Sequence, residues 1–81
     1  MVTVLGMINT QQVNMINYIV VCINEFGVRF NMSSKKAFNY LNKYSGISFL
    51  REHYEIEHTL SIDNAIEDLV LICKRNGGHL Y

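Results

Sequence analysis

The regular spacing of apolar residues after Ser61 is the clearest pattern in the chain. Serine is a strong helix N-cap, and the apolar residues that follow it recur at the intervals of one helix face. Those residues are Ile62, Ala65, Ile66, Leu69, Ile72 and Cys73. An acid in the first turn and two basic residues in the last turn oppose the helix dipole favourably. The pattern predicts an amphipathic helix that ends at the Asn-Gly-Gly sequence of residues 76–78.

A broader apolar face predicts a long helix from residue 10 to residue 26. On a helical wheel, one side collects apolar residues, with Met15 and Cys22 at its edge. The residues on that side are Val13, Ile16, Ile19, Val20, Ile23 and Phe26. A face this wide is typical of the central helix of a small bundle, and Gly27 is the predicted stop. The preceding residues 1–9, MVTVLGMIN, fit either an apolar N-terminal arm or a short strand.

Two shorter helices are predicted between these. Ser33 or Ser34 provides the N-cap of a helix that runs to residue 44. Its predicted core face consists of Ala37, Phe38 and Leu41, with Tyr40 and Tyr44 beside it. The sequence Ser45-Gly46 interrupts the pattern, and a third helix follows over residues 47–54.

The predicted elements indicate an all-α fold, a small bundle of about four helices. The 81 residues are enough for one domain, 1–81. Hydrophobic residues make up 49% of the chain and charged residues 17%. A domain this small cannot bury all of those apolar side chains, so some must lie on its surface, where they favour self-association or a partner protein. The net charge of zero removes the basic field that is typical of nucleic-acid binders.

Neither a membrane span nor a disulfide framework is predicted. The longest apolar run covers residues 18–23, whereas a span needs about 20 apolar residues. The two cysteines, Cys22 and Cys73, fall inside apolar helix patterns and lack the spacing of a zinc site. We expect both thiols to be reduced, buried and therefore unreactive. These features predict a cytoplasmic protein that needs no cofactor.

Residues 52–59, EHYEIEHT, raise the question of a metal or catalytic site, because they combine histidine and glutamate in a chain that is poor in charge. His53 and His58 are five residues apart, so on a helix their side chains point about 140° apart and cannot share an ion. Glu55 and His58 match the Glu-x-x-His element of di-iron bundles, but such sites need a second copy of it, which the chain lacks. We therefore predict no metal ligand and no catalytic residue.

The alternative is that this stretch is a polar turn between two helices. The third helix would then end near Tyr54, and Thr59 and Ser61 would satisfy open backbone donors. His58 would be a structural residue that forms hydrogen bonds within the turn. The candidate polar cluster of the turn consists of Tyr54, His58 and Thr59.

Charge is divided into two blocks along the chain. Residues 29–51 contain five basic residues and no acid, and residues 52–68 contain six acids and no lysine or arginine. The blocks either face each other, or are solvated, or one of them meets a partner of opposite charge.

The basic block includes both short helices and their tight turn, an arrangement similar to a helix-turn-helix. In such a motif the third predicted helix would be the recognition helix that enters the DNA groove. Glu52 and Glu55, in and next to that helix, would repel the DNA phosphates, so DNA binding is only the alternative function.

A candidate partner surface lies on the last predicted helix. Leu71 lies opposite the core face, among charged residues of both signs. The candidate surface consists of Glu67, Leu71, Lys74 and Arg75. A single exposed leucine is common on soluble proteins, but a leucine within a ring of charge is also typical of a small contact site.

A series of residues from position 37 onward matches the pattern of a known family. They are Ala37, Phe38, Tyr40, Leu41, Tyr44, Gly46, Ile47, Phe49, Leu50, Tyr54, His58, Thr59, Glu67, Asp68, Leu69, Gly77 and Gly78. With them the chain resembles a family of small uncharacterised bacterial proteins, described only as a domain of unknown function. The resemblance implies no catalytic residue. Members of that family are often encoded beside a protein similar to an ADP-ribosyltransferase toxin, so the resemblance implies a partner-binding role, as an antitoxin or an accessory protein.

The sequence as a whole predicts a non-catalytic protein-interaction domain. Its predicted partner is another protein, for which the resemblance implies the ADP-ribosyltransferase-like toxin, or a second copy of the chain. The alternative is a small DNA-binding regulator that uses the second and third predicted helices.

Overall fold

The computed structural model describes residues 10–80 and contains five helices and no strand over that range. The helices are α2 (Thr10–Phe30), α3 (Ser34–Lys43), α4 (Gly46–Glu52), α5 (Tyr54–Glu57) and α6 (Ile62–Arg75). The predicted all-α fold is confirmed. The N-terminal arm or strand predicted for residues 1–9 lies outside the described residues.

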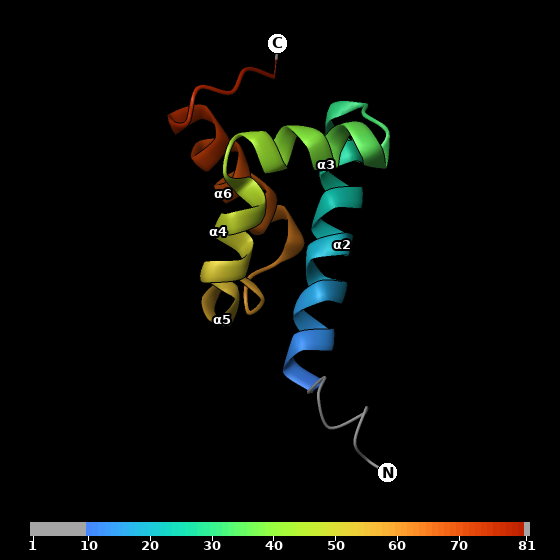
Figure 1. Cartoon of the computed structure of the whole chain (residues 1–81), viewed down its shortest axis with the longest axis vertical. Coiled ribbons are helices and arrows are strands. Elements are labelled where there is room, and N and C mark those ends of the chain that lie inside the picture. The colour runs from blue at the N-terminus through green and yellow to red at the C-terminus, as the bar shows by residue number, and fades with distance from the viewer. Residues whose placement is uncertain (1–9, 81) are drawn as a thin grey trace.

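The long helix α2 forms one side of the molecule, as Figure 1 shows. α3 crosses one end of α2 and packs against it, and α4 continues from α3 alongside α2. α6 packs against both α2 and α4, which closes the bundle around one core. The short helix α5 follows α4 and lies toward the end of the molecule where α2 begins (Figure 1).

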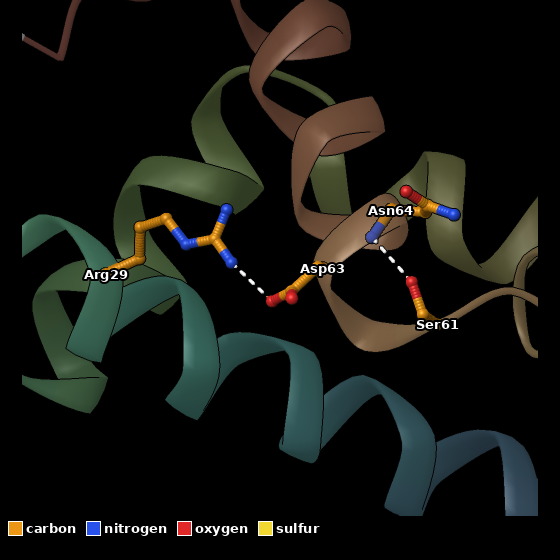
Figure 2. A network of polar contacts seen from close by, with 4 residues as sticks. All are labelled: Arg29, Ser61, Asp63 and Asn64. Carbon is orange, nitrogen blue, oxygen red and sulfur yellow. Dashed lines mark hydrogen bonds and ion pairs between the residues drawn. The ribbon is translucent and has the colours of Figure 1, made fainter.

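Two serine side chains cap helices. The Oγ atom of Ser61 accepts a hydrogen bond from the main-chain N–H of Asn64 at 3.1 Å, at the start of α6 (Figure 2). Of the two candidates for α3, Ser33 is the cap, because its Oγ atom accepts from the N–H of Lys36 at 3.1 Å. Each of these bonds satisfies a donor that the first turn of a helix leaves open.

Gly27 does not end α2, contrary to the sequence prediction. The helix continues to Phe30, and Asn31 takes the left-handed conformation (φ 57°) that ends it. The main-chain N–H of Met32 donates to the carbonyl oxygen of Gly27 at 2.8 Å. A Cβ atom on residue 27 would lie only 2.7 Å from the carbonyl oxygen of Met32. Glycine is therefore needed because the returning chain passes close to the helix.

The third predicted helix, residues 47–54, is divided in two. α4 ends at Glu52, and Tyr54 begins the separate turn of α5. Ser45, rather than glycine, takes the left-handed conformation between α3 and α4, with φ 70°. Gly46 is buried as the first residue of α4, where an added Cβ would lie 2.9 Å from Leu41 and 3.3 Å from the sulfur of Cys73.

Over residues 10–80, the core contains nine fully buried side chains from four helices. They are Cys22, Phe26, Ala37, Leu41, Leu50, Ala65, Ile66, Leu69 and Cys73. The predicted core face of α6 is confirmed, with Ile62 and Ile72 half-buried at its margins. Part of the predicted face of α2 is wrong: three of its members (Val13, Ile16 and Val20) are exposed.

Phe38 was predicted in the core and is exposed. The other two members of that predicted face, Ala37 and Leu41, are fully buried, and the Cβ atom of Ala37 lies 3.5 Å from the position that a Cβ on Gly27 would occupy. Two small residues at this crossing allow α3 to lie close to α2, and this orientation turns Phe38 toward solvent.

We predict that Leu69→Ala lowers the free energy of unfolding by about 2–5 kcal/mol, because Leu69 is fully buried and its truncation leaves a cavity. The matched control is Leu71→Ala, which removes the same atoms from a side chain that is 54% exposed. The control should change stability by no more than about 0.5 kcal/mol. Urea denaturation followed by circular dichroism measures both, and equal effects would contradict the packing of α6.

Candidate interaction surface

Three exposed apolar side chains form a row along the N-terminal half of α2. Val13, Ile16 and Val20 are 43%, 60% and 47% exposed, and their spacing of three and four residues places them on one face. We call these three residues the α2 stripe. Single exposed apolar residues are ordinary, but a row of them on one helix face is typical of a protein contact site.

An open depression borders the α2 stripe. Its lining residues are Gln12, Met15, Ile16, Ile19 and Arg51, so α4 contributes the arginine and α2 the remainder. Within residues 10–80 the side chain of Arg51 forms no ion pair, since the ion pair found there joins Arg29 to Asp63. The stripe is therefore an apolar row with a depression at its edge, and that depression is lined by a cation that has no ion pair among the described residues.

The two charge blocks of the sequence meet in one place. Arg29 of α2 and Asp63 of α6 form an ion pair with an N–O distance of 2.6 Å (Figure 2). Both side chains are partly or largely exposed, so this pair stabilises the fold little. The other basic residues of the block carry no ion pair within the part of the chain that the structure describes. They are Lys35, Lys36, Lys43 and Arg51.

The candidate surface predicted on α6 is exposed. Leu71 is 54% exposed, and Glu67, Lys74 and Arg75 are exposed around it. Lys74 also lines a second depression together with Tyr40 and residues 78–80. One leucine offers less apolar area than the α2 stripe, and the role of this surface stays a prediction.

The residues of the candidate polar cluster, Tyr54, His58 and Thr59, lie together in α5 and the turn that follows it. The rings of Tyr54 and His58 stack with centroids 4.4 Å apart. The Nδ1 atom of His58 lies 2.6 Å from the carbonyl oxygen of Tyr54, which can only accept, so Nδ1 carries the proton. The hydroxyl of Thr59 donates to the carbonyl oxygen of Ile56 at 2.6 Å. The Thr59 hydroxyl therefore satisfies a main-chain carbonyl, whereas the sequence predicts that it satisfies a main-chain N–H donor. Ser61 does satisfy such a donor, the N–H of Asn64.

Within residues 10–80, no group of three or more histidine, cysteine or acidic side chains is arranged to hold a metal ion. Glu55 instead accepts a hydrogen bond from the side chain of Gln11 near the start of α2. No helix over the same range is long and apolar enough to cross a membrane.

Glu57 is a buried acid that the sequence reasoning missed. Its side chain is only 5% exposed, and its Oε1 atom has no hydrogen-bond partner. Burial, followed by the hydrogen bond and the negative charge of Asp68 on α6, raises the pKa of Glu57 to about 7. We call Glu57 and Asp68 the buried acid pair. A signal for it exists in the sequence, because Glu57 continues the three- and four-residue spacing of Ile47, Leu50 and Tyr54.

Tyr18 of α2 contacts the turn that carries Glu57. Its hydroxyl donates to the main-chain carbonyl oxygen of Glu57 at 3.0 Å, and its ring meets the ring of Tyr54 edge to face, with centroids 5.6 Å apart. Burial, together with the neighbouring groups Cys22, Glu57 and Asp68, raises the pKa of the Tyr18 hydroxyl. This hydroxyl therefore stays protonated and acts as a donor near neutral pH.

Comparison with known proteins places the chain in a family. The family described as "Protein of unknown function (DUF3791)" matches residues 17–76, and the chain belongs to it. The resemblance inferred from the sequence is thereby confirmed as regards the family. The matched range includes Tyr18, Glu57 and Asp68, whereas Val13 and Ile16 precede it. No curated protein and no solved structure matches the chain.

We predict that neither cysteine reacts with a thiol reagent in the folded protein at pH 8. Cys22 and Cys73 are free and fully buried, and burial raises the pKa of each thiol to about 11, so thiolate is scarce. Labelling with Ellman's reagent should remain near zero in buffer and reach both thiols in denaturant. A cysteine introduced by Ser48→Cys, at an exposed position of α4, is the positive control. Prompt labelling of either native thiol would contradict the burial.

Proposed function

We propose that this member of the DUF3791 family is a cytoplasmic, non-catalytic protein-interaction domain that binds an amphipathic helix of a partner protein along the α2 stripe. The observation that carries the proposal is the stripe itself, three branched apolar side chains on one helix face that the fold leaves uncovered. Covering side chains that are about half exposed stabilises a complex by about 1 kcal/mol for each of them. The stripe and its depression therefore suit a contact of modest size.

The partner's chemistry follows from the borders of the stripe. A row of apolar residues at three- and four-residue spacing fits the apolar face of a second helix. Arg51 lies at the edge of the depression, without an ion pair in the described part of the chain. A carboxylate beside the partner's apolar face would pair with it and set the orientation of the two helices.

The resemblance stated above suggests which partner to test first. We expect an ADP-ribosyltransferase-like toxin to be that partner, with this chain acting as its antitoxin or accessory protein. The surface of α6 around Leu71 would then be a second contact with the same protein.

DNA binding is the second candidate function. The observation in its favour is that the three lysines of α3 form no ion pair within residues 10–80. Against it, Glu52 and Glu55 are exposed on α4 and α5, where they would repel the phosphate backbone. Retention on immobilised DNA that weakens as salt increases would identify this function.

We predict that a photo-crosslinking amino acid at position 16 captures one partner protein from the host lysate. The crosslinked segment of that partner should have apolar residues at helical spacing and an acidic residue beside them. Ile16→Asp and Val20→Asp should each lower binding of that partner at least about tenfold, because they place a charge in the contact. Arg51→Glu should weaken binding, and an acid-to-lysine change in the partner should restore it. An ADP-ribosyltransferase-like protein from the same host is tested directly by co-purification.

Asn14→Asp is the matched control, because it adds the same charge at an exposed position of α2 away from the stripe. Circular dichroism verifies that each variant is folded. Crosslinks only to a second copy of the chain, with a dimer in sedimentation that Ile16→Asp disrupts, would replace the proposal by self-association. Loss of binding in Leu71→Asp but not in Ile16→Asp would move the contact to α6.

A further inference from the structure

The buried acid pair lies where three helices meet. Glu57 belongs to α5, Asp68 to α6, and α2 supplies Tyr18, whose hydroxyl donates to the carbonyl oxygen of Glu57. The Glu57 side chain is 5% exposed and its Oε1 atom has no partner. A buried carboxylate without a partner destabilises the fold that holds it, whereas a protonated carboxyl is tolerated.

No cation compensates a charge on Glu57 in the described part of the chain. The titratable groups that face it are Asp68 from α6 and Tyr18 and Cys22 from α2. On its own side, Tyr54 is buried in the same turn, and His58 is exposed and bonded through Nδ1 to the carbonyl oxygen of Tyr54. The groups that act electrostatically on Glu57 are therefore Asp68, Tyr18 and Cys22, and none of them is a cation.

The short helix α5 depends on few contacts. Besides burying Tyr54 and Glu57, α5 meets α2 through three contacts: the Tyr18 hydroxyl, the edge-to-face contact between the Tyr18 and Tyr54 rings, and the hydrogen bond from Gln11 to Glu55. Ile56, in the middle of α5, is 65% exposed. A segment with so few buried contacts can separate from the bundle while the larger helices stay packed.

We propose that Glu57 is a proton-dependent switch: its protonated carboxyl holds α5 between α2 and α6, and loss of the proton releases α5 toward solvent. The inference does not rest on the proposed function, because its observations come from the opposite side of α2 from the stripe. Release breaks the Tyr18 contacts with Tyr54 and Glu57 and hydrates the carboxylate.

The direction of the effect follows from the pKa of Glu57, which rises from 4.5 to about 7 in the fold. The closed state binds the proton more tightly than the open state, so the closed state is most favoured below pH 4.5. The free-energy advantage of the closed state over the open state is lost as pH rises from 4.5 through 7. The open fraction therefore increases with pH across the neutral range.

The test is hydrogen–deuterium exchange of the full chain at pH 5 and pH 8, with Glu57→Gln as the non-titrating variant. At pH 8 the amides of residues 54–60 should exchange at least about tenfold faster in the native protein than in Glu57→Gln, and at pH 5 the difference should shrink to about fourfold or less. Comparison at one pH cancels the intrinsic pH dependence of exchange. The amides in the middle of α6 should show a much smaller difference, which separates local release from global unfolding.

Glu52→Gln is the matched control, since it makes the same change at an exposed acid of α4 and should behave like the native protein. Asp68→Asn is the second variant: it removes the neighbouring acid and offers an amide donor, so α5 should stay protected at pH 8. This variant keeps the test decisive if Glu57→Gln does not fold. Equal protection of residues 54–60 in native protein, Glu57→Gln and Asp68→Asn at pH 8 would overturn the switch.

Discussion

The rotation of α2 about its own axis is the constraint on which the rest of the structure depends. The apolar face of α2 is wider than the area that the other helices can cover, so packing decides which side of α2 is buried. Cys22 and Phe26 fill the core from that side, and the ring of Phe26 lies 5.7 Å from the ring of Tyr40 on α3, centroid to centroid. Gly27 allows the chain to return close to the helix. Once these contacts are made, the α2 stripe must face outward and Tyr18 must face α5.

The predictability of each helix depends on how closely its apolar face matches the area that is buried. α6 has apolar residues at the positions its neighbours cover, so its core face could be predicted from spacing alone. α2 has a wider apolar face, and Cys22, expected at its edge, is at its buried centre. Spacing cannot decide this rotation, because contacts from α3 and α6 decide it. Phe38 was misplaced for the same reason, since the close crossing at Ala37 selects the smaller side chain.

The candidate sites also differ in whether they depend on residues nearby in the sequence or on residues far away in it. The polar turn could be predicted, because His58 and Thr59 bond to carbonyl groups four and three residues before them. The exposure of Leu71 also followed from the periodicity of its own helix. Glu57 was missed because an acid in a polar stretch is normally solvated. Its burial requires α6 and Tyr18 to cover it, and those residues are far away in the sequence.

The stripe and the buried acid pair use opposite sides of one helical segment. Tyr18 lies about 140–160° around α2 from the three stripe residues, so a partner on the stripe leaves the α5 side unobstructed. Yet both sides belong to the same turns of helix, and in the described structure α5 contacts these turns through Gln11 and Tyr18. Release of α5 would leave the start of α2 supported by fewer contacts, and a helix end with fewer contacts is less ordered. A partner that needs the stripe as a rigid helix face would then bind most tightly while Glu57 is protonated, because binding and closure of α5 would stabilise the same helix.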